Sequence, residues 1–243
     1  MIPLTYARFE LLRALRNVRF FVFSLVFPLV MLVLVAGPNK HETLAGIPFP
    51  VYYMTGMVAW GTMAAVIATG GRISGERSVS WNRQLRVTPL TARDYLAAKI
   101  ATGYMMALLS MIALYAVGIG LGVTLPAARW VGMTVFILIG LIPFAVLGIF
   151  LGHVLTPESI GPALGGITAL FALLGGAWGP IAASSGFLHA LVQLLPSYWL
   201  VQAGKIAYLG RAWPAKAWGV IAVWTLVATW LAMQAWRRDT QRG

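Results

Sequence analysis

Few side chains in this 243-residue sequence could support acid–base, nucleophilic or metal chemistry. The chain has six acidic residues, three histidines and no cysteine. A protein metal site needs such side chains in a cluster, whereas His41, His153 and His189 fall on separate segments. His189 follows Ser184 and Ser185 closely, but no Gly-x-Ser-x-Gly elbow surrounds either serine. The sequence therefore predicts no catalytic residue and no metal site.

A nucleotide-binding loop is not expected either. Gly204 and Lys205 are followed by Ile206 rather than by Ser or Thr, and the upstream glycine of a P-loop is missing. The chain by itself is therefore not expected to be an enzyme, and no cofactor is expected on it. Any ATP hydrolysis that drives it would belong to another polypeptide.

The composition indicates an integral membrane protein. The chain is 60% hydrophobic and 10% charged, whereas soluble domains carry roughly 25% charged residues. Apolar runs long enough to cross a bilayer recur along its whole length. The net charge of +12 would suggest a nucleic-acid partner in a soluble protein, but cytoplasmic loops of membrane proteins also collect Lys and Arg. We therefore expect one membrane domain over residues 1–243 and no nucleic-acid partner.

The hydropathy pattern predicts an all-α fold with six transmembrane helices. They are expected over residues 20–36, 51–70, 100–123, 130–155, 160–178 and 217–236. The amphipathic segment 1–19, with Arg8, Arg13 and Arg16 on its cationic face, is expected to lie along the lipid surface as an interfacial helix. Segment 179–203 is interrupted by proline and glycine, which predicts a re-entrant helical hairpin before the last helix.

The distribution of basic residues predicts the orientation. If both termini are cytoplasmic, the cytoplasmic side receives four arginines from the start of the chain, six Lys or Arg from segment 71–99 and three arginines from the end. The opposite side then receives only five basic residues. The positive-inside rule therefore favours a multi-pass protein with a cytoplasmic N-terminus and C-terminus.

The longest polar segment, 71–99, is expected to be a cytoplasmic loop with one or two short helices that docks on a soluble partner. Its apolar and charged residues alternate, as in a docking surface, although an ordinary positive-inside loop is the alternative. Residues 88–93 have the pattern of a helix start that leads into the third span. The candidate contact residues are Glu76, Arg77, Arg83, Leu85, Arg86, Val87, Thr88, Pro89 and Leu90.

The segment around the predicted re-entrant hairpin is a candidate outer gate over a central pathway. An extracellular hairpin anchored by aromatic residues is the alternative. The candidate gate residues are Gly175, Gly176, Trp178, Pro180, Pro196, Tyr198 and Trp199. Small residues four apart, such as Gly148 and Gly152, predict close helix packing, and packing within the chain is favoured over contact with another subunit.

Three segments together resemble a known family. The amphipathic start runs into Phe27-Pro28-Leu29-Val30. The polar segment has Glu76-Arg77, then Leu85-Arg86-Val87-Thr88-Pro89-Leu90, then Tyr95 and Lys99. The last segment is Gly175-Gly176, Pro180 and Leu195-Pro196-Ser197-Tyr198-Trp199. Over essentially its whole length the chain resembles ABC type-2 transporter permeases, the membrane subunits of bacterial ABC exporters for drugs, polyketides, polysaccharides and lipids. One departure is Ser80-Trp81-Asn82, where the family often has Gly-Thr-Leu.

The resemblance implies a half-transporter in the bacterial cytoplasmic membrane. Two permeases, as a homodimer or with a sister permease, would join two copies of a cytosolic ABC ATPase that holds ATP and Mg. Residues 76–90 would match the family's ATPase-coupling helix, segment 1–19 its interfacial helix and the re-entrant pair its outer gate. An ATP-independent secondary transporter or channel is the alternative function, but the inverted repeats or charged selectivity element that it would need are not evident.

A substrate pathway that opens and closes is expected along the second and fifth spans. The candidate lining residues are Tyr53, Met57, Trp60, Met63, Leu170, Phe171 and Leu174. Such a lining is apolar and aromatic, and methionine adapts to varied apolar ligands. An amphiphilic or hydrophobic substrate, such as a drug, lipid or natural product, is therefore expected to move outwards.

Overall fold

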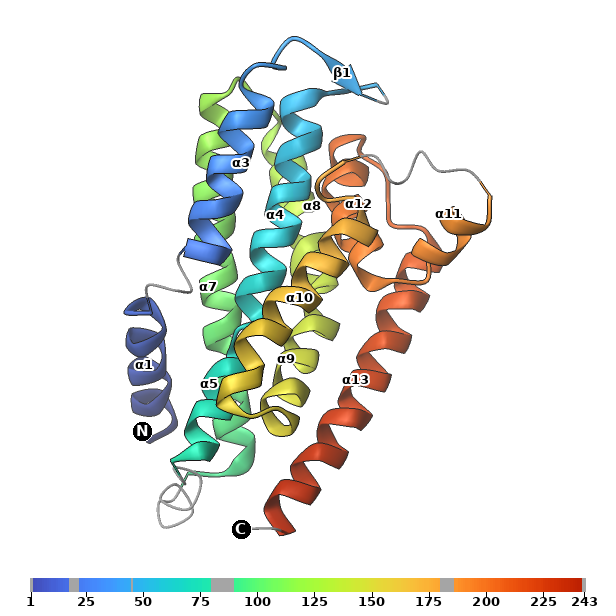
Figure 1. The fold of residues 1–243 in the computed structure, drawn as a ribbon. Coiled ribbons are helices and arrows are strands. Elements are labelled where there is room, and N and C mark those ends of the chain that lie inside the picture. The colour runs from blue at the N-terminus through green and yellow to red at the C-terminus, as the bar shows by residue number, and fades with distance from the viewer. Residues whose placement is uncertain (1, 18–21, 45, 80–89, 180–185, 242–243) are drawn as a thin grey trace.

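The chain forms a helical bundle with one short hairpin. The computed structural model describes residues 2–17, 22–44, 46–79, 90–179 and 186–241. Strands β1 (Thr43–Leu44) and β2 (Ile47–Pro48) pair antiparallel. Figure 1 shows the long helices side by side, with α1 beside the bundle and both chain ends at the same end of it.

The described part of the chain is mostly helical. In chain order the helical elements are α1 (Ile2–Leu15), the π-helical turn η1 (Val22–Val26), α3 (Phe27–Ala36), α4 (Phe49–Ile67), α5 (Thr69–Ser78), α7 (Ala92–Gly120), α8 (Ala127–Gly140), α9 (Ile142–Val154), α10 (Pro157–Gly175), α11 (Phe187–Val192), α12 (Pro196–Tyr208) and α13 (Ala215–Gln241). The all-α prediction is confirmed for the described residues.

Within the described residues, five helical stretches are long and apolar enough to cross a membrane. They are Phe49–Ser78, Ala92–Gly120, Ala127–Val154, Pro157–Gly175 and Ala215–Asp239. They coincide with five of the six predicted spans, and a shorter apolar helix, Ser24–Ala36, occupies the place of the first. The chain is therefore a multi-pass membrane protein with an all-α bundle.

Both ends of the predicted loop 71–99 are helical, and these helices continue the neighbouring spans instead of forming short helices of their own. Helix α5 continues from α4 to Ser78, and α7 begins at Ala92. The start of α7 confirms the predicted helix boundary, since the Thr91 hydroxyl accepts a hydrogen bond of 3.2 Å from the Asp94 amide. Charged residues occupy these helical ends because they pair with one another, as described below. The middle of the predicted loop, residues 80–89, lies outside the described residues.

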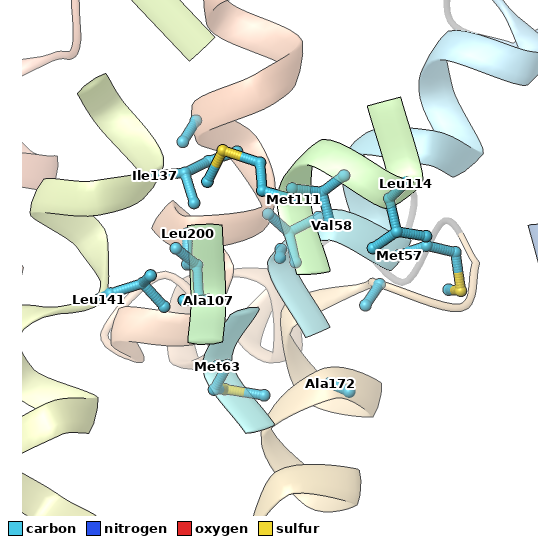
Figure 2. Close-up of a cluster of buried hydrophobic side chains, with 14 of the residues drawn as sticks. Met57, Val58, Met63, Ala107, Met111, Leu114, Ile137, Leu141, Ala172 and Leu200 are labelled. Carbon is cyan, nitrogen blue, oxygen red and sulfur yellow. The ribbon is translucent and has the colours of Figure 1, made fainter. Parts of the chain in front are cut away.

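Helix α4 is the centre of the core. It contacts α3, α7, α9, α10 and α12, and most of its side chains are buried. Figure 2 shows Met57 and Met63 of α4 in an apolar cluster with Met111, Ile137 and Leu200 from three other helices. Because Met57 and Met63 are 0% and 1% exposed, their predicted role in lining a pathway is corrected: both side chains fill the core.

Three glycines allow the α4–α5 helix and α9 to cross at backbone contact. A Cβ on Gly70 would lie 2.3 Å from the Gly148 carbonyl oxygen, and one on Gly152 would lie 2.7 Å from the Gly70 carbonyl oxygen. No side chain fits such a gap. The predicted use of Gly148 and Gly152 for packing within the chain is confirmed.

Replacing Gly70 with alanine tests this crossing. We expect Gly70→Ala to lower the free energy of unfolding by about 1–3 kcal/mol, because the added methyl group meets backbone rather than a movable side chain. The measurement is the thermal unfolding midpoint of the purified protein in detergent. Gly165→Ala is the matched control, since a Cβ there would have nothing within 4 Å and alanine favours helix more than glycine does. Equal midpoints for the two variants would contradict the crossing.

Candidate functional site

A buried cation joins three helices at the end of the bundle that holds both chain ends. Lys99 of α7 is 0% exposed, and its partners Glu10 of α1 and Glu76 of α5 are 4% and 1% exposed. The Lys99 Nζ atom lies 2.7 Å from Glu10 Oε1 and 2.6 Å from Glu76 Oε1. One ammonium group therefore connects two carboxylates from separate elements.

Two arginines and a tyrosine surround this pair of carboxylates. We call Glu10, Arg13, Arg72, Glu76 and Lys99 the charge cluster. Arg72 Nε lies 2.9 Å from Glu10 Oε1, and Arg13 Nη1 lies 2.9 Å from Glu76 Oε1. The Tyr95 hydroxyl donates a hydrogen bond of 2.7 Å to Glu76 Oε2. Arg13 is the most exposed member of the cluster, with 60% of its side chain exposed. Both oxygens of the Glu76 carboxylate are thus engaged by groups from α1 and α7.

Beside the cluster lies the uncharged side chain of Tyr6 of α1. Its ring centroid lies 6.0 Å from that of Tyr95, and burial together with the charges of Glu76 and Glu10 raises the pKa of its phenol. The hydroxyl therefore stays protonated and adds no third negative charge. Among the described residues it has no hydrogen-bond partner.

The opposite side of α5 is held by a second ionic group. Arg77 Nε lies 2.8 Å from Asp239 Oδ2 of α13, and His153 Nδ1 lies 3.1 Å from the same oxygen. Arg77 Nη1 also donates a hydrogen bond of 3.1 Å to the Gly152 carbonyl at the end of α9. The His153 ring packs edge-on against Trp236, at 5.1 Å between centroids. Helix α5 is thereby tied to α9 and α13 as well as to α1 and α7.

The structure redefines the predicted docking residues. Glu76 is buried, so it holds helices together instead of facing a soluble partner. Leu90 is half-buried and packs against an apolar group that includes Ile73 and Ile149, so it is not presented on a free surface either. Arg77 is a quarter exposed and is bound to Asp239. The other predicted docking residues lie outside the described residues: Arg83, Leu85, Arg86, Val87, Thr88 and Pro89.

The three arginines predicted for the interfacial helix occupy its exposed side. Arg8, Arg13 and Arg16 are all exposed, and Arg16 follows directly after the end of α1. Phe9 and Leu12 are exposed too, at 65% and 45%. The buried side instead contains Glu10, which the amphipathic pattern did not reveal.

The predicted gate residues gather where α10 meets α12. Gly176 ends α10 in the left-handed conformation, with φ of 76°, and a Cβ on Gly175 would lie 2.8 Å from the Ser197 carbonyl oxygen. Pro196 begins α12, while Tyr198 and Trp199 are buried on it. Pro180 lies outside the described residues. The two glycines thus permit a close contact between α10 and α12.

Aromatic contacts link Trp60, one of the remaining pathway candidates, to this region. Trp60 packs edge-on against Trp178 at 5.1 Å and against Phe27 at 4.9 Å. On α10, Leu170 is 56% exposed, whereas Phe171 and Leu174 are half-buried. Tyr53 is 6% exposed and stacks on Phe49, so it belongs to the core with the two methionines.

Sequence reasoning missed most of the charge cluster as a unit. Glu10, Arg72, Tyr95 and Lys99 were not assigned as one site. The available signal was spacing, since Arg72 and Glu76, like Tyr95 and Lys99, are four residues apart and so share a helix face. Among the described residues, no three His, Asp or Glu side chains group in a way that could hold a metal ion.

Removing the central cation tests the energetic role of the cluster. We expect Lys99→Met to lower the free energy of unfolding by about 3–5 kcal/mol, because it leaves Glu10 and Glu76 buried without the ammonium between them. The measurement is the thermal unfolding midpoint in detergent, with the exposed Lys40→Met as control. Adding Glu76→Gln to Lys99→Met should recover part of the loss. A single variant as stable as the control would contradict the cluster.

Comparisons with known proteins agree with this architecture. The model of one protein family, described as ABC-2 family transporter protein, matches residues 38–233. The chain is also 29% identical over 194 residues to YvfS of Bacillus subtilis (strain 168), a protein named as a transport permease, with 78% of each chain covered. The family match covers the helices from α4 to α12 and most of α13, and it includes the charged residues of α5 and α7. The chain therefore belongs to the ABC-2 family of transporter proteins, as a membrane-embedded transport permease of an ABC transporter.

Proposed function

We propose that this chain is the permease subunit of an ATP-driven exporter that moves an amphiphilic or hydrophobic substrate out across the bacterial cytoplasmic membrane. The substrate class is a drug, a lipid or a natural product. A separate ATPase subunit supplies the energy and holds ATP and Mg. The observation that carries the proposal is the pair of ionic groups on α5, which fasten the helix next to segment 80–89 to four other elements.

The proposed assembly contains two ATPase copies and a second permease, identical or a sister. Membership of the ABC-2 family supports an ATPase partner, because the sequence of this chain has no P-loop of its own. The exposed apolar side chains of α10, such as Leu170 and Leu173, are a surface that a second permease or lipid would cover.

The proposed topology has six crossings, with α3 as the first, and both termini in the cytoplasm. Figure 1 supports it, since both chain ends lie at the same end of the bundle. Helix α1 is proposed to lie along the membrane surface. Its exposed Phe9 and Leu12 would enter the lipid, while Arg8 and Arg16 would meet the head groups. Helices α11 and α12 are proposed as the re-entrant pair and outer gate.

The proposed mechanism transmits motion along α4 and α5. ATPase movement enters at segment 80–89 and displaces α5. The Lys99 and Asp239 contacts carry the displacement to α1, α7, α9 and α13 without separating buried charges. The Phe49–Ser78 stretch of 30 residues forms a rod of roughly 45 Å at 1.5 Å per residue. At its far half, Trp60 contacts Trp178 beside the proposed gate. Transport then requires two arrangements that bind the substrate differently.

The residues proposed to line the pathway are chosen by the exposure of their side chains. Trp60, Leu170, Phe171 and Leu174 remain candidates, because each retains exposed surface on α4 or α10. They would form an apolar, aromatic surface between two permeases. Such a surface favours an amphiphile over a hydrophilic sugar or an ion.

Reconstitution tests the function. The permease is purified with its ATPase subunit and placed in liposomes loaded with a fluorescent amphiphile. We expect export that requires ATP and both subunits, because this chain has no nucleotide site. Liposomes with either subunit alone are the control. Equal export from permease liposomes without ATPase would refute the proposal in favour of an ATP-independent carrier.

Breaking the α5–α13 link tests the coupling route. We expect Asp239→Asn to reduce export per ATP hydrolysed by about fivefold or more, the effect of losing at least 1 kcal/mol of coupling. It leaves Arg77 and His153 without their shared carboxylate, yet the site is partly exposed, so folding should survive. The control is Arg238→Gln, at the exposed residue next to Asp239. The exchanged pair Arg77→Asp with Asp239→Arg should recover part of the coupling. Wild-type export per ATP in Asp239→Asn would rule out this route.

A further inference from the structure

A second buried lysine has no carboxylate partner. Lys205 of α12 is 6% exposed. All six acidic residues of the chain are among the described residues, and within the described part of the chain their ion pairs involve Arg13, Arg72, Arg77, Lys99 and His153 only. A buried cation without a counter-charge is unfavourable in apolar surroundings. Lys205 therefore differs from Lys99, which has two carboxylates.

The Lys205 ammonium lies instead over the face of an aromatic ring. Its Nζ atom is 3.6 Å from the centroid of the Tyr52 ring on α4. Tyr198 lies seven residues before Lys205 on α12, which places both on one face of that helix. A ring face attracts a cation, but it cannot fully satisfy the three N–H donors of an ammonium group. The lysine thus keeps donor capacity for another group.

The amine is accessible although most of the side chain is buried. It makes no hydrogen bond to the described residues, and it does not belong to the polar atoms that are both sealed from solvent and without a partner. An incoming oxygen atom can therefore reach it. The long apolar stem of the lysine remains packed in the bundle.

A second cation strengthens the positive field at this place. Arg129 Nη1 donates hydrogen bonds to the carbonyls of Ala207 and Tyr208, at 3.2 and 3.1 Å, and so caps the end of α12. Like Lys205, Arg129 forms no ion pair with any of the six acidic side chains. In Figure 1, α12 lies towards the opposite end of the bundle from α1 and α5. At that end, neither of these two cations is neutralised by an acidic side chain.

We propose that Lys205, beside the Tyr52 ring, binds the anionic head group of the transported amphiphile, a carboxylate or a phosphate. This inference rests on the proposed export function and narrows its substrate class to acidic amphiphiles. The anion supplies the counter-charge and the hydrogen-bond acceptors that the protein does not. The apolar part of the ligand lies along the bundle or the lipid. Because Lys205 is remote from the charge cluster, it draws an acidic group towards the outer end of the proposed pathway.

The test measures binding to the purified permease alone, without nucleotide. The probes are oleate, oleyl phosphate and the neutral oleyl alcohol, which share one chain. Titration calorimetry in detergent gives their affinities for the wild type, Lys205→Met, Lys205→Arg and the exposed control Lys216→Met. We expect Lys205→Met to lose about tenfold or more in affinity for both anions and to keep its affinity for the alcohol. Lys205→Arg and Lys216→Met should preserve the preference for anions.

The anionic head group at Lys205 could also be that of a membrane phospholipid. A second measurement distinguishes a phospholipid from the transported amphiphile. Copurifying phosphatidylglycerol is quantified by mass spectrometry before and after incubation with oleate. Displacement by oleate supports a cargo site. Phosphatidylglycerol that depends on Lys205 and resists oleate would overturn the assignment to cargo.

An unchanged ratio of oleate to oleyl alcohol affinity in Lys205→Met would overturn the anion site itself. Equal weakening of all three probes with a lower unfolding midpoint would do the same, because it indicates a structural role. Failure of the export function appears elsewhere, as ATP-independent export from liposomes. The binding difference at Lys205 does not depend on that result.

Discussion

A lysine ammonium removed from water needs acceptors within hydrogen-bond distance, and Lys99 finds two carboxylates from different helices. Glu10 also pairs with Arg72 and Glu76 with Arg13, but Lys99 is the cation that the two buried carboxylates share. Removing one partner of a buried ion pair is strongly unfavourable. The three side chains therefore hold one another in place, and with them α1, α5 and α7. The position of α1 against the bundle depends on this constraint, because large apolar side chains of this helix, such as Phe9, face outwards rather than into the bundle.

Around this ionic end, the bundle is assembled by close packing. Gly70, Gly148 and Gly152 bring α4–α5 and α9 to backbone contact, and α4 is enclosed by five other helices. A rod so enclosed moves as a unit, because packed interiors do not deform continuously. Under the proposed mechanism, a displacement at α5 would reach Trp60 and its neighbour Trp178. The packing is consistent with a permease that uses work performed by another subunit.

The two ends of the bundle differ in whether their charged side chains have counter-charges. At the end of α1 and α5, the buried carboxylates Glu10 and Glu76 are each paired with a cation, and they share Lys99. Near α12, Lys205 and Arg129 have only an aromatic ring and helix carbonyls as partners among the described residues. Under the proposed function, the paired charges serve mechanical transmission and the cation without a counter-charge serves recognition of an anion. The two proposed roles then belong to opposite ends of the bundle.

The sequence by itself determined the membrane class, five of the spans and a helix start within residues 88–93, because hydropathy and helix caps are local properties. It also indicated the family, through motifs in the polar segment and before α13. Tertiary structure alone decided which residues meet. Glu76, expected at a docking surface, is buried beside Lys99, and Met57, expected in a pathway, fills the core. Lys205 enters the sequence analysis only where a P-loop is excluded, yet it is buried in the fold. Side-chain burial and charge pairing depend on contacts between residues distant along the chain, and no local pattern contains that information.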